Sequence, residues 1–215
     1  MVTPSVVPPS QWRREQGLIL AEEKRITREL DALAARRRRM PAMAVEKDYV
    51  FEGADGPVTL LDMFEGRSQL IVYCFMWHEG AEPCSGCALF TDNVGELAHL
   101  NARDTTMAWS SPGPLADLHA FRDRMGWQIP WYSAQGNTFH DDFDAGTGFA
   151  LNVFLRNGND IYRTYFTTSR GVERLGSTWT FLDLTPLGRQ ETWEDSPDGH
   201  PQTAPYTWWR LHDDY

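Results

Sequence analysis

The chain is poor in cysteine and has no long apolar run. Three cysteines among 215 residues are too few for the multiple disulfides that stabilise small secreted domains. A membrane-spanning helix needs roughly 20 consecutive apolar residues, whereas the longest apolar run here, 70–76, has the length of a strand. Residues 1–9 also lack the basic segment and apolar stretch of a secretory signal. We therefore expect a cytoplasmic protein with no membrane partner.

Several common catalytic signatures are missing as well. No glycine-rich phosphate loop follows a strand-like segment, and neither Gly-x-Ser-x-Gly nor His-Glu-x-x-His occurs. The net charge is −10, from 20 basic and 30 acidic side chains, and phosphate backbones repel an acidic protein. Four consecutive arginines at 36–39 are an exception, which we interpret as a solvated helix end. Nucleotide, hydrolase and nucleic-acid chemistry thus have no support in the sequence.

What the chain does contain is ample material for a core, since 41% of its residues are hydrophobic and nine are tryptophan. Apolar residues recur at near-helical spacing between Ser10 and Met40, which predicts an amphipathic helix with Ser10 as N-cap and Pro41 as terminator. The apolar stripe of this helix must be buried, either on the rest of the chain or on a second copy. The second arrangement would make the chain a homodimer through this helix.

The remaining pattern predicts an α/β fold. Strand-like and helix-like segments alternate, and the buried character of 69–76 suits a strand covered on both faces. The expected elements are a hairpin over 49–60, strands at 69–76 and 104–110, helices at 85–100 and 115–125, an extended segment at 127–133, a loop at 134–149, a hairpin around 157–159 and a helix at 171–184. This order predicts a mixed sheet with helices on both faces. We divide the chain into an N-terminal helical extension (1–47), an α/β domain (48–190) and an aromatic-rich C-terminal tail packed on the domain (191–215).

The most informative motif is Cys84-Ser85-Gly86-Cys87. It follows the buried strand and a loop, and Pro83 just before it favours the start of a helix. A thiol at a helix N-terminus faces unpaired backbone N–H groups, which stabilise the thiolate and lower the pKa. The two sulfurs, three positions apart, fall on one side of the first turn. We interpret Cys84 as the attacking thiol and Cys87 as the resolving thiol of a redox pair.

Metal binding is the alternative interpretation of the same residues. Met76, His78, Cys84 and Cys87 lie close together in sequence, and sulfur ligands with one imidazole suit Cu(I) or Zn(II). A further alternative is that both cysteines are inert. We interpret Cys74 as a small buried core residue.

Several stretches together resemble the DUF899 family, a group of bacterial proteins described as predicted thioredoxin-like dithiol-disulfide oxidoreductases. The matching stretches are Tyr-Val-Phe-Glu-Gly (49–53), Gln-Leu-Ile-Val-Tyr (69–73), Phe-Met-Trp-His (75–78), Cys-Ser-Gly-Cys (84–87), Leu-Asn-Ala-Arg-Asp-Thr-Thr (100–106), Met-Gly-Trp (125–127), Pro-Trp-Tyr-Ser (130–133) and Leu-Asp-Leu-Thr-Pro-Leu-Gly-Arg (182–189). The resemblance runs from about residue 10 to about residue 190. It implies a thioredoxin-like fold and a redox role for Cys84 and Cys87.

From the resemblance and the motif we expect a thiol-disulfide oxidoreductase, with peroxidase-like activity as a variant of it, that needs no cofactor. Its substrate would be a thiol or disulfide, in a small molecule or a protein, and Trp77 and His78 would shape the cleft. One departure stands out, because thioredoxin-like oxidoreductases usually carry a cis-proline just before the strand of the last hairpin. In this chain the corresponding residues, 148–150, are Gly-Phe-Ala, with no proline. The nearest upstream proline is Pro130, which we count among the residues that line the cleft.

Overall fold

The computed structural model describes residues 4–215, which form two compact units. One unit holds the N-terminal segment up to Pro41 together with Asp195–Pro201, and the other holds Ala42–Glu194 and Gln202–Tyr215. The candidate site lies wholly in the second unit. None of the helices in the described part of the chain is long and apolar enough to cross a membrane.

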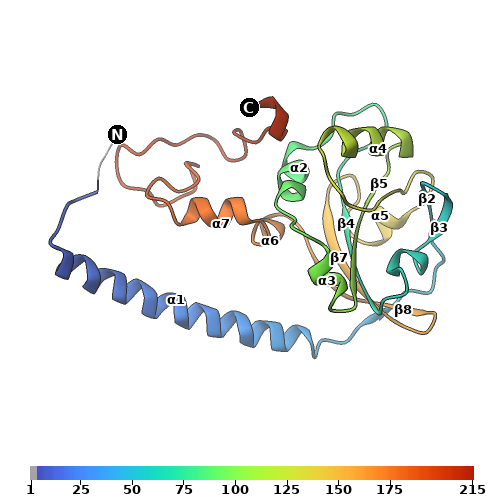
Figure 1. The fold of residues 1–215 in the computed structure, drawn as a ribbon, viewed down its shortest axis with the longest axis horizontal. Coiled ribbons are helices and arrows are strands. Elements are labelled where there is room, and N and C mark those ends of the chain that lie inside the picture. Colours follow the sequence, from blue (N-terminus) through green and yellow to red (C-terminus); the bar gives the residue numbers. More distant parts are fainter. Residues whose placement is uncertain (1–3) are drawn as a thin grey trace. The chain divides into compact units, whose positions relative to one another are not determined.

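The first unit contains the expected long helix, α1 (Pro9–Arg37), drawn in blue in Figure 1. Its N-cap is Pro8 and Pro9 occupies the first turn, so the prediction that Ser10 caps the helix is wrong. Proline suits this place because the first helical N–H groups have no intrahelical acceptor. Arg36 and Arg37 lie in the last turn, where positive charge complements the helix dipole. No side chain of α1 is buried, and the homodimer through this helix stays a prediction.

The second unit is built on one eight-stranded mixed sheet (Figure 1). The strands are β1 (Met43–Ala44), β2 (Val50–Gly53), β3 (Gly56–Thr59), β4 (Gln69–Cys74), β5 (Thr105–Ser111), β6 (Trp131–Ser133), β7 (Ala150–Asn157) and β8 (Asp160–Thr167), in the order β1-β8-β7-β4-β5-β6-β2-β3. Within this sheet, β4 runs parallel to β5, and β7 runs antiparallel to both β4 and β8. This is the thioredoxin-like architecture that the sequence predicted.

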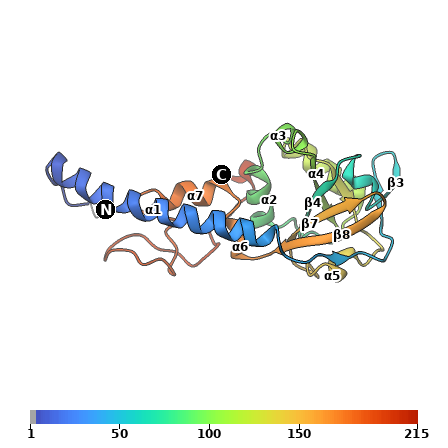
Figure 2. The same ribbon diagram turned by 90° about the horizontal axis from the view of Figure 1, so that it is seen from below.

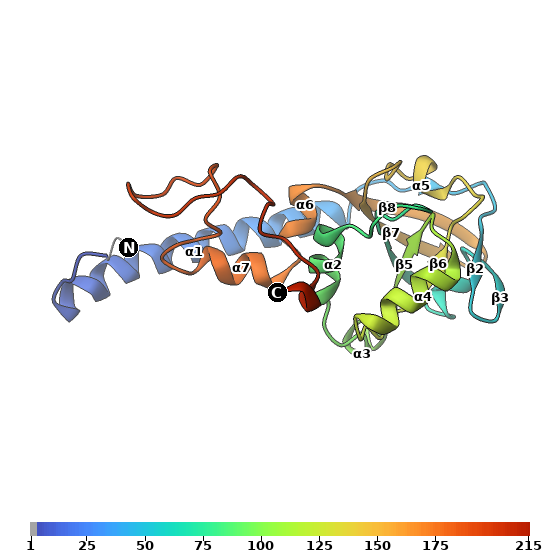
Figure 3. The same ribbon diagram turned by 90° about the horizontal axis from the view of Figure 1, so that it is seen from above.

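Helical elements cover both faces of the sheet, as expected (Figures 2 and 3). One core contains residues of α2 (Ser85–Asp92), α4 (Leu115–Arg124) and α7 (Ser177–Asp183). The other core contains residues of η1 (Asp62–Phe64) and α5 (Phe139–Asp142). Strand β4 serves both cores because its side chains alternate in direction, so Tyr73 joins the first core, and Val72 and Cys74 join the second.

Two predicted helices are each broken in two. The helix expected at 85–100 ends at Asp92 and resumes as α3 (Ala98–Asn101), because the Asn93 side chain bonds back to the Leu89 carbonyl and Gly95 follows. The helix expected at 171–184 is α6 (Arg170–Glu173) followed by α7. Helix α5 lies inside the segment expected to be a loop, and the short strand β1 was not foreseen. A last short helix, η2 (His212–Asp214), ends the chain.

The second core contains a buried polar cluster on the face of β4 opposite the dithiol. The His140 Nε2 lies 3.0 Å from Ser110 Oγ, while its Nδ1 has no hydrogen-bond partner. Ser110 and Asn152 both donate weakly to the Cys74 sulfur, at 3.9 and 3.8 Å. Burial, reinforced by the nearby His78, lowers the pKa of His140 from 6.5 to about 4. The imidazole is therefore neutral in the folded protein at neutral pH.

This burial predicts an acid-sensitive contribution to stability. In the unfolded chain His140 takes up a proton below pH 6.5, whereas in the folded chain it does so only near pH 4. The contribution is therefore fully present above pH 6.5 and is lost as the pH falls towards 4. Between pH 7 and pH 5, we expect wild type to lose about 2 kcal/mol more of its free energy of unfolding than His140→Gln loses. Urea unfolding at both pH values measures this, with a change at the exposed His99, His99→Gln, as the control. Equal losses in wild type and His140→Gln would contradict it.

Candidate functional site

Cys84 caps the N-terminus of α2. Its backbone is extended (φ −64°, ψ 116°), so the helix begins at the next residue, and its sulfur accepts the backbone N–H of Cys87 at 3.3 Å. The position follows from the sequence, since Pro83 cannot donate a helical hydrogen bond and the loop after β4 delivers the chain to this point. The cap thus uses a sulfur where serine or aspartate is usual.

The two thiols have opposite acid–base properties. An interaction with the Cys87 side chain is the main cause that lowers the pKa of Cys84 to about 7, and the N–H groups of Cys87 and Gly86 add to it against an opposing effect of burial. Burial is the main cause that raises the pKa of Cys87 well above its ordinary value, with the neighbouring Cys84 sulfur adding to it. Cys87 is 1% exposed, whereas Cys84 is partly exposed. One sulfur is therefore a thiolate near neutral pH, and the other keeps its proton beside it.

Cys74 belongs to a different environment. It lies on the opposite face of β4, fully buried, and burial raises its pKa to about 12. Its neighbour Tyr73 faces the dithiol instead, and an interaction with the Tyr73 side chain partly offsets the rise in the pKa of Cys87. The alternation of β4 thus separates an unreactive cysteine from the reactive pair.

A cavity of about 330 Å³ is lined in part by Cys84. Six aromatic side chains line much of it, namely Tyr73, Phe90, Phe149, Trp179, Tyr206 and Trp209. Phe149 stands just before β7, in the place where the sequence lacks the expected proline. Met76 also lines the cavity, and Glu173 is an ionisable group on its wall. The volume lies at the lower end of the range for small-molecule sites.

The C-terminal tail supplies one wall of this cavity. The Trp209 ring lies on the first turn of α2, so close to Gly86 that a Cβ there would meet its ring carbons at 2.5 and 2.6 Å. Trp209 packs edge-on to Trp179 with ring centroids 5.8 Å apart, and it packs against Tyr206 at 4.5 Å. The indole N–H groups of Trp179 and Trp209 are buried without a hydrogen-bond partner. Gly86 therefore allows an aromatic residue from the tail to lie directly on the dithiol motif.

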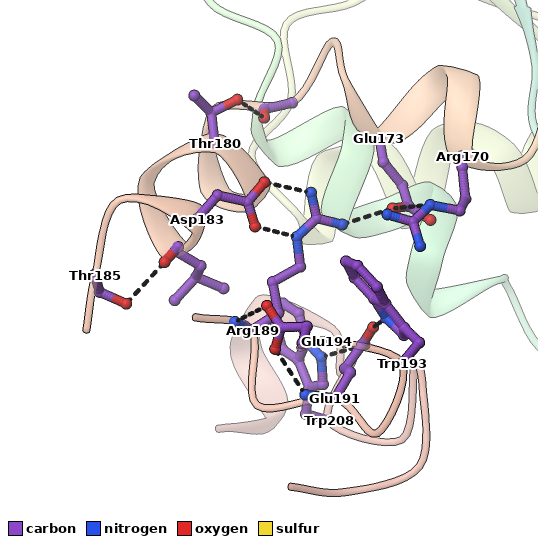
Figure 4. Close-up of polar contacts among 12 residues, drawn as sticks. Arg170, Glu173, Thr180, Asp183, Thr185, Arg189, Glu191, Trp193, Glu194 and Trp208 are labelled. Carbon is purple, nitrogen blue, oxygen red and sulfur yellow. Dashed lines mark hydrogen bonds and ion pairs between the residues drawn. The ribbon is translucent and has the colours of Figure 1, made fainter. Parts of the chain in front are cut away.

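A buried carboxylate of the tail itself stabilises the conformation of this segment. Glu191 is 2% exposed and accepts hydrogen bonds from the Tyr206 backbone N–H and the Trp208 indole at 2.8 Å, and from the Trp193 indole at 2.5 Å. Figure 4 shows Glu191 beside the Trp193 and Trp208 side chains. Three donors from the tail thus converge on one side chain, which fixes the segment that leads to Trp209.

An arginine connects the cavity wall to the same region. Arg189 bonds both oxygens of Asp183, at 2.7 and 2.8 Å, and its third nitrogen bonds Glu173 at 2.7 Å (Figure 4). The Arg189 and Glu173 side chains are 8% and 9% exposed. The carboxylate on the cavity wall is therefore already paired with a guanidinium.

A second attachment lies at the end of the chain and is more exposed. Arg124 of α4 forms two hydrogen bonds to Asp213, at 2.7 and 2.9 Å, with side chains that are 50% and 35% exposed. His212 bonds Asp92 at the end of α2 at 2.8 Å. These contacts place η2 against α2 and α4, but they remain in contact with water.

The residues predicted to shape the cleft lie outside the lining of this cavity. The Trp77 indole donates to the Ala81 carbonyl at 2.8 Å and packs on Phe121. His78 Nε2 lies 3.2 Å from the Thr147 carbonyl, and Pro130 lines another hollow, beside α4. Their role in substrate binding stays a prediction. The many aromatic residues of the tail were the one sign of these cavity walls in the sequence. Nothing in the sequence indicated that they would lie next to the dithiol.

The proposed metal ligands are only partly brought together. Met76 and Cys84 line the same cavity, and the backbone N–H of Cys87 contacts the Cys84 sulfur. His78 instead contacts the Thr147 carbonyl. Within residues 4–215, no group of three or more His, Cys, Asp or Glu side chains is arranged to hold a metal ion.

Comparisons with known proteins agree with the resemblance seen in the sequence. A family model described as "Bacterial protein of unknown function (DUF899)" matches residues 1–215. None of the curated proteins matches the chain. Among solved structures, a candidate thiol:disulfide interchange protein DsbE from Chlorobium tepidum has a TM-score of 0.44 and 14% identity, with 63% of this chain and 93% of that chain covered.

Two further structures give similar values. The pneumococcal exposed lipoprotein thioredoxin Etrx1 from Streptococcus pneumoniae has a TM-score of 0.43 and 13% identity, with 60% of this chain and 98% of that chain covered. A candidate protein disulfide isomerase from Bacteroides thetaiotaomicron has a TM-score of 0.43 and 17% identity, with 65% and 91% covered.

Proposed function

The chain belongs to the DUF899 family of bacterial proteins, and we propose that it is a dithiol-disulfide oxidoreductase whose redox centre is Cys84 and Cys87. One observation carries the proposal, which is the contrast between the two thiols. Cys84 caps a helix with its sulfur on a backbone N–H, and the pKa of its thiol falls to about 7. Cys87, buried next to it, stays protonated. This is the arrangement that an attacking and a resolving thiol require.

The chemistry proceeds in two displacements. The Cys84 thiolate attacks one sulfur of a substrate disulfide, the substrate S–S bond breaks, and the other substrate sulfur leaves as a thiolate. Cys87 then attacks the Cys84 sulfur, gives its proton to a leaving thiolate, and releases the second substrate thiol. Two electrons pass from the dithiol to the substrate, and the protein ends with a Cys84–Cys87 disulfide. An attacking thiol such as Cys84, whose pKa lies near the ambient pH, makes the first displacement fast.

The pH dependence of thiol alkylation tests this proposal. In the reduced protein, we expect iodoacetamide to label Cys84 with a midpoint near pH 7, so that the rate at pH 6 is about a tenth of the plateau. Cys74 and Cys87 stay unlabelled on the same time scale, because both are buried and both thiols are protonated. Peptide mass spectrometry after timed labelling gives the rate at each site.

The control is the same protein unfolded in urea, where all three thiols are expected to react with an ordinary midpoint of about 8.5. A folded-state midpoint for Cys84 at or above that value would contradict the proposal, since the helix cap would then give the sulfur no special reactivity.

A further inference from the structure

We propose that the cavity beside Cys84 selects small, uncharged aromatic disulfides, and that the tail residue Trp209 excludes polypeptide substrates from the dithiol. The inference rests on the proposed function and adds the substrate class. It follows from three features of the second unit, which are the aromatic lining of the cavity, its charge, and the position of the tail.

The lining favours a flat apolar group next to the reacting sulfur. Cys84 borders a space of about 330 Å³ that is walled mostly by aromatic residues. Rings of this kind bind other rings in stacked or edge-on geometry and gain further from the removal of apolar surface from water. The space accommodates one aromatic thiol half of a disulfide, while the other half, the leaving group, extends through the open side. The chain therefore offers a binding site for the group that becomes attached to Cys84.

The charge of the cavity disfavours anionic substrates. Among the described residues that line it, none is Lys or Arg, and the Cys84 thiolate is itself negative at neutral pH. The nearby cations are already paired with carboxylates, since Arg189 bonds both Glu173 and Asp183 and Arg170 lies 4.0 Å from Glu173. An anionic disulfide would lose its hydration without gaining a partner.

The tail covers the surface that a polypeptide would need. A peptide that carries a disulfide must lie along the start of α2 to bring its sulfur to Cys84. Here the Trp209 ring occupies that place, in contact with Gly86, and Glu191 fixes the preceding segment. A small molecule can enter beside the ring, but a folded protein cannot approach without displacement of the tail.

The test compares two aromatic disulfides that differ in charge. The first is 4,4′-dithiodipyridine, which is neutral, and the second is 5,5′-dithiobis(2-nitrobenzoate), which is anionic. Each second-order rate is divided by the rate for the same protein unfolded in urea, so that the intrinsic reactivity of the reagent cancels. We expect this normalised rate to be at least about tenfold higher for the neutral reagent in wild type. Insulin, as a protein disulfide, is expected to react no faster with the folded protein than with the unfolded chain.

Two variants remove the tail from the motif in different ways. Trp209→Ala deletes the ring, and Gly86→Ala displaces it, because a Cβ would lie 2.5 Å from the ring carbons. In both, we expect the preference for the neutral reagent to fall to about threefold or less and the reaction with insulin to become faster. Trp12→Ala, which removes an exposed ring of α1, is the matched control and keeps wild-type values. Circular dichroism verifies that each variant is folded.

A measurement on wild type alone keeps the inference testable if both variants fail to fold. Bis(4-pyridyl) sulfide has the shape of the neutral reagent but no S–S bond, and we expect it to protect Cys84 from iodoacetamide. The substrate class would be overturned if the sulfide did not protect Cys84 and the two reagents reacted at equal normalised rates. The proposed function would stay intact if the midpoint of Cys84 alkylation were still near pH 7. A midpoint at the ordinary value of about 8.5 would instead overturn the proposed function itself.

Discussion

The Cys87→Ser protein should capture one thiopyridyl group from 4,4′-dithiodipyridine and stop there, whereas reduced wild type should release both. In wild type, Cys87 attacks the Cys84 sulfur and displaces the second thiol. Serine cannot do so, and the mixed disulfide on Cys84 remains. Absorbance of the released thiopyridone counts the groups, and intact-mass spectrometry detects the adduct.

The Cys84→Ser protein should react only slowly with 4,4′-dithiodipyridine. Its remaining thiols, Cys74 and Cys87, are 0% and 1% exposed, and burial raises the pKa of each. We expect its reaction to be slower than that of wild type by about a hundredfold or more, because both thiolate fraction and access are lost. Cys74→Ala is the matched control and should react like wild type, since its sulfur lies on the other face of β4.

These three variants together assign the roles of the two thiols. Release of two thiopyridone groups by Cys87→Ser would mean that another thiol resolves the mixed disulfide. A Cys84→Ser protein that reacts as fast as wild type would mean that Cys84 is not the attacking group. Either result would contradict the two-step mechanism.

The sequence predicted the features that depend on local patterns. The apolar run that became β4 has the length of a strand, contains the β-branched Ile71 and Val72 and lacks proline, which favours a buried strand. Pro83 and the spacing of Cys84 and Cys87 placed the dithiol at a helix start without any knowledge of the fold. The general preference of free cysteine for burial was also sufficient to place Cys74 in the core. Each of these inferences uses residues that are neighbours in sequence.

The cavity could not be predicted in this way, because its walls come from distant parts of the chain. Phe149 precedes β7, Trp179 lies on α7, and Trp209 arrives from the tail. Only the complete fold brings them to Cys84. The two helix breaks were not predicted for a related reason. The spacing of apolar residues carries no information about the hydrogen bond from the Asn93 side chain to the Leu89 carbonyl, or about the contact of the Trp179 ring with Gly176.

Glu191 should have the largest effect on stability of any single tail residue. Its carboxylate is buried and accepts three hydrogen bonds, two of them from the indoles of Trp193 and Trp208. In Glu191→Ala these donors lose their acceptor. At about 1–3 kcal/mol for each buried donor left unpaired, and with partial relief by water, we expect a loss of about 3–5 kcal/mol in the free energy of unfolding or detachment of the tail.

The exposed ion pair between Arg124 and Asp213 provides the control for this prediction. Arg124→Ala removes two hydrogen bonds to Asp213 on side chains that are 50% and 35% exposed, and such pairs contribute about 0–1 kcal/mol. Urea unfolding measures both variants, and labelling of Cys84 by a bulky neutral maleimide reports whether the tail has left α2. If Glu191→Ala were no less stable than Arg124→Ala and gave the same labelling rate, the tail would be held by its apolar contacts alone. If instead labelling accelerates only in Glu191→Ala, the buried carboxylate controls access to the dithiol, because the segment that it fixes carries Trp209.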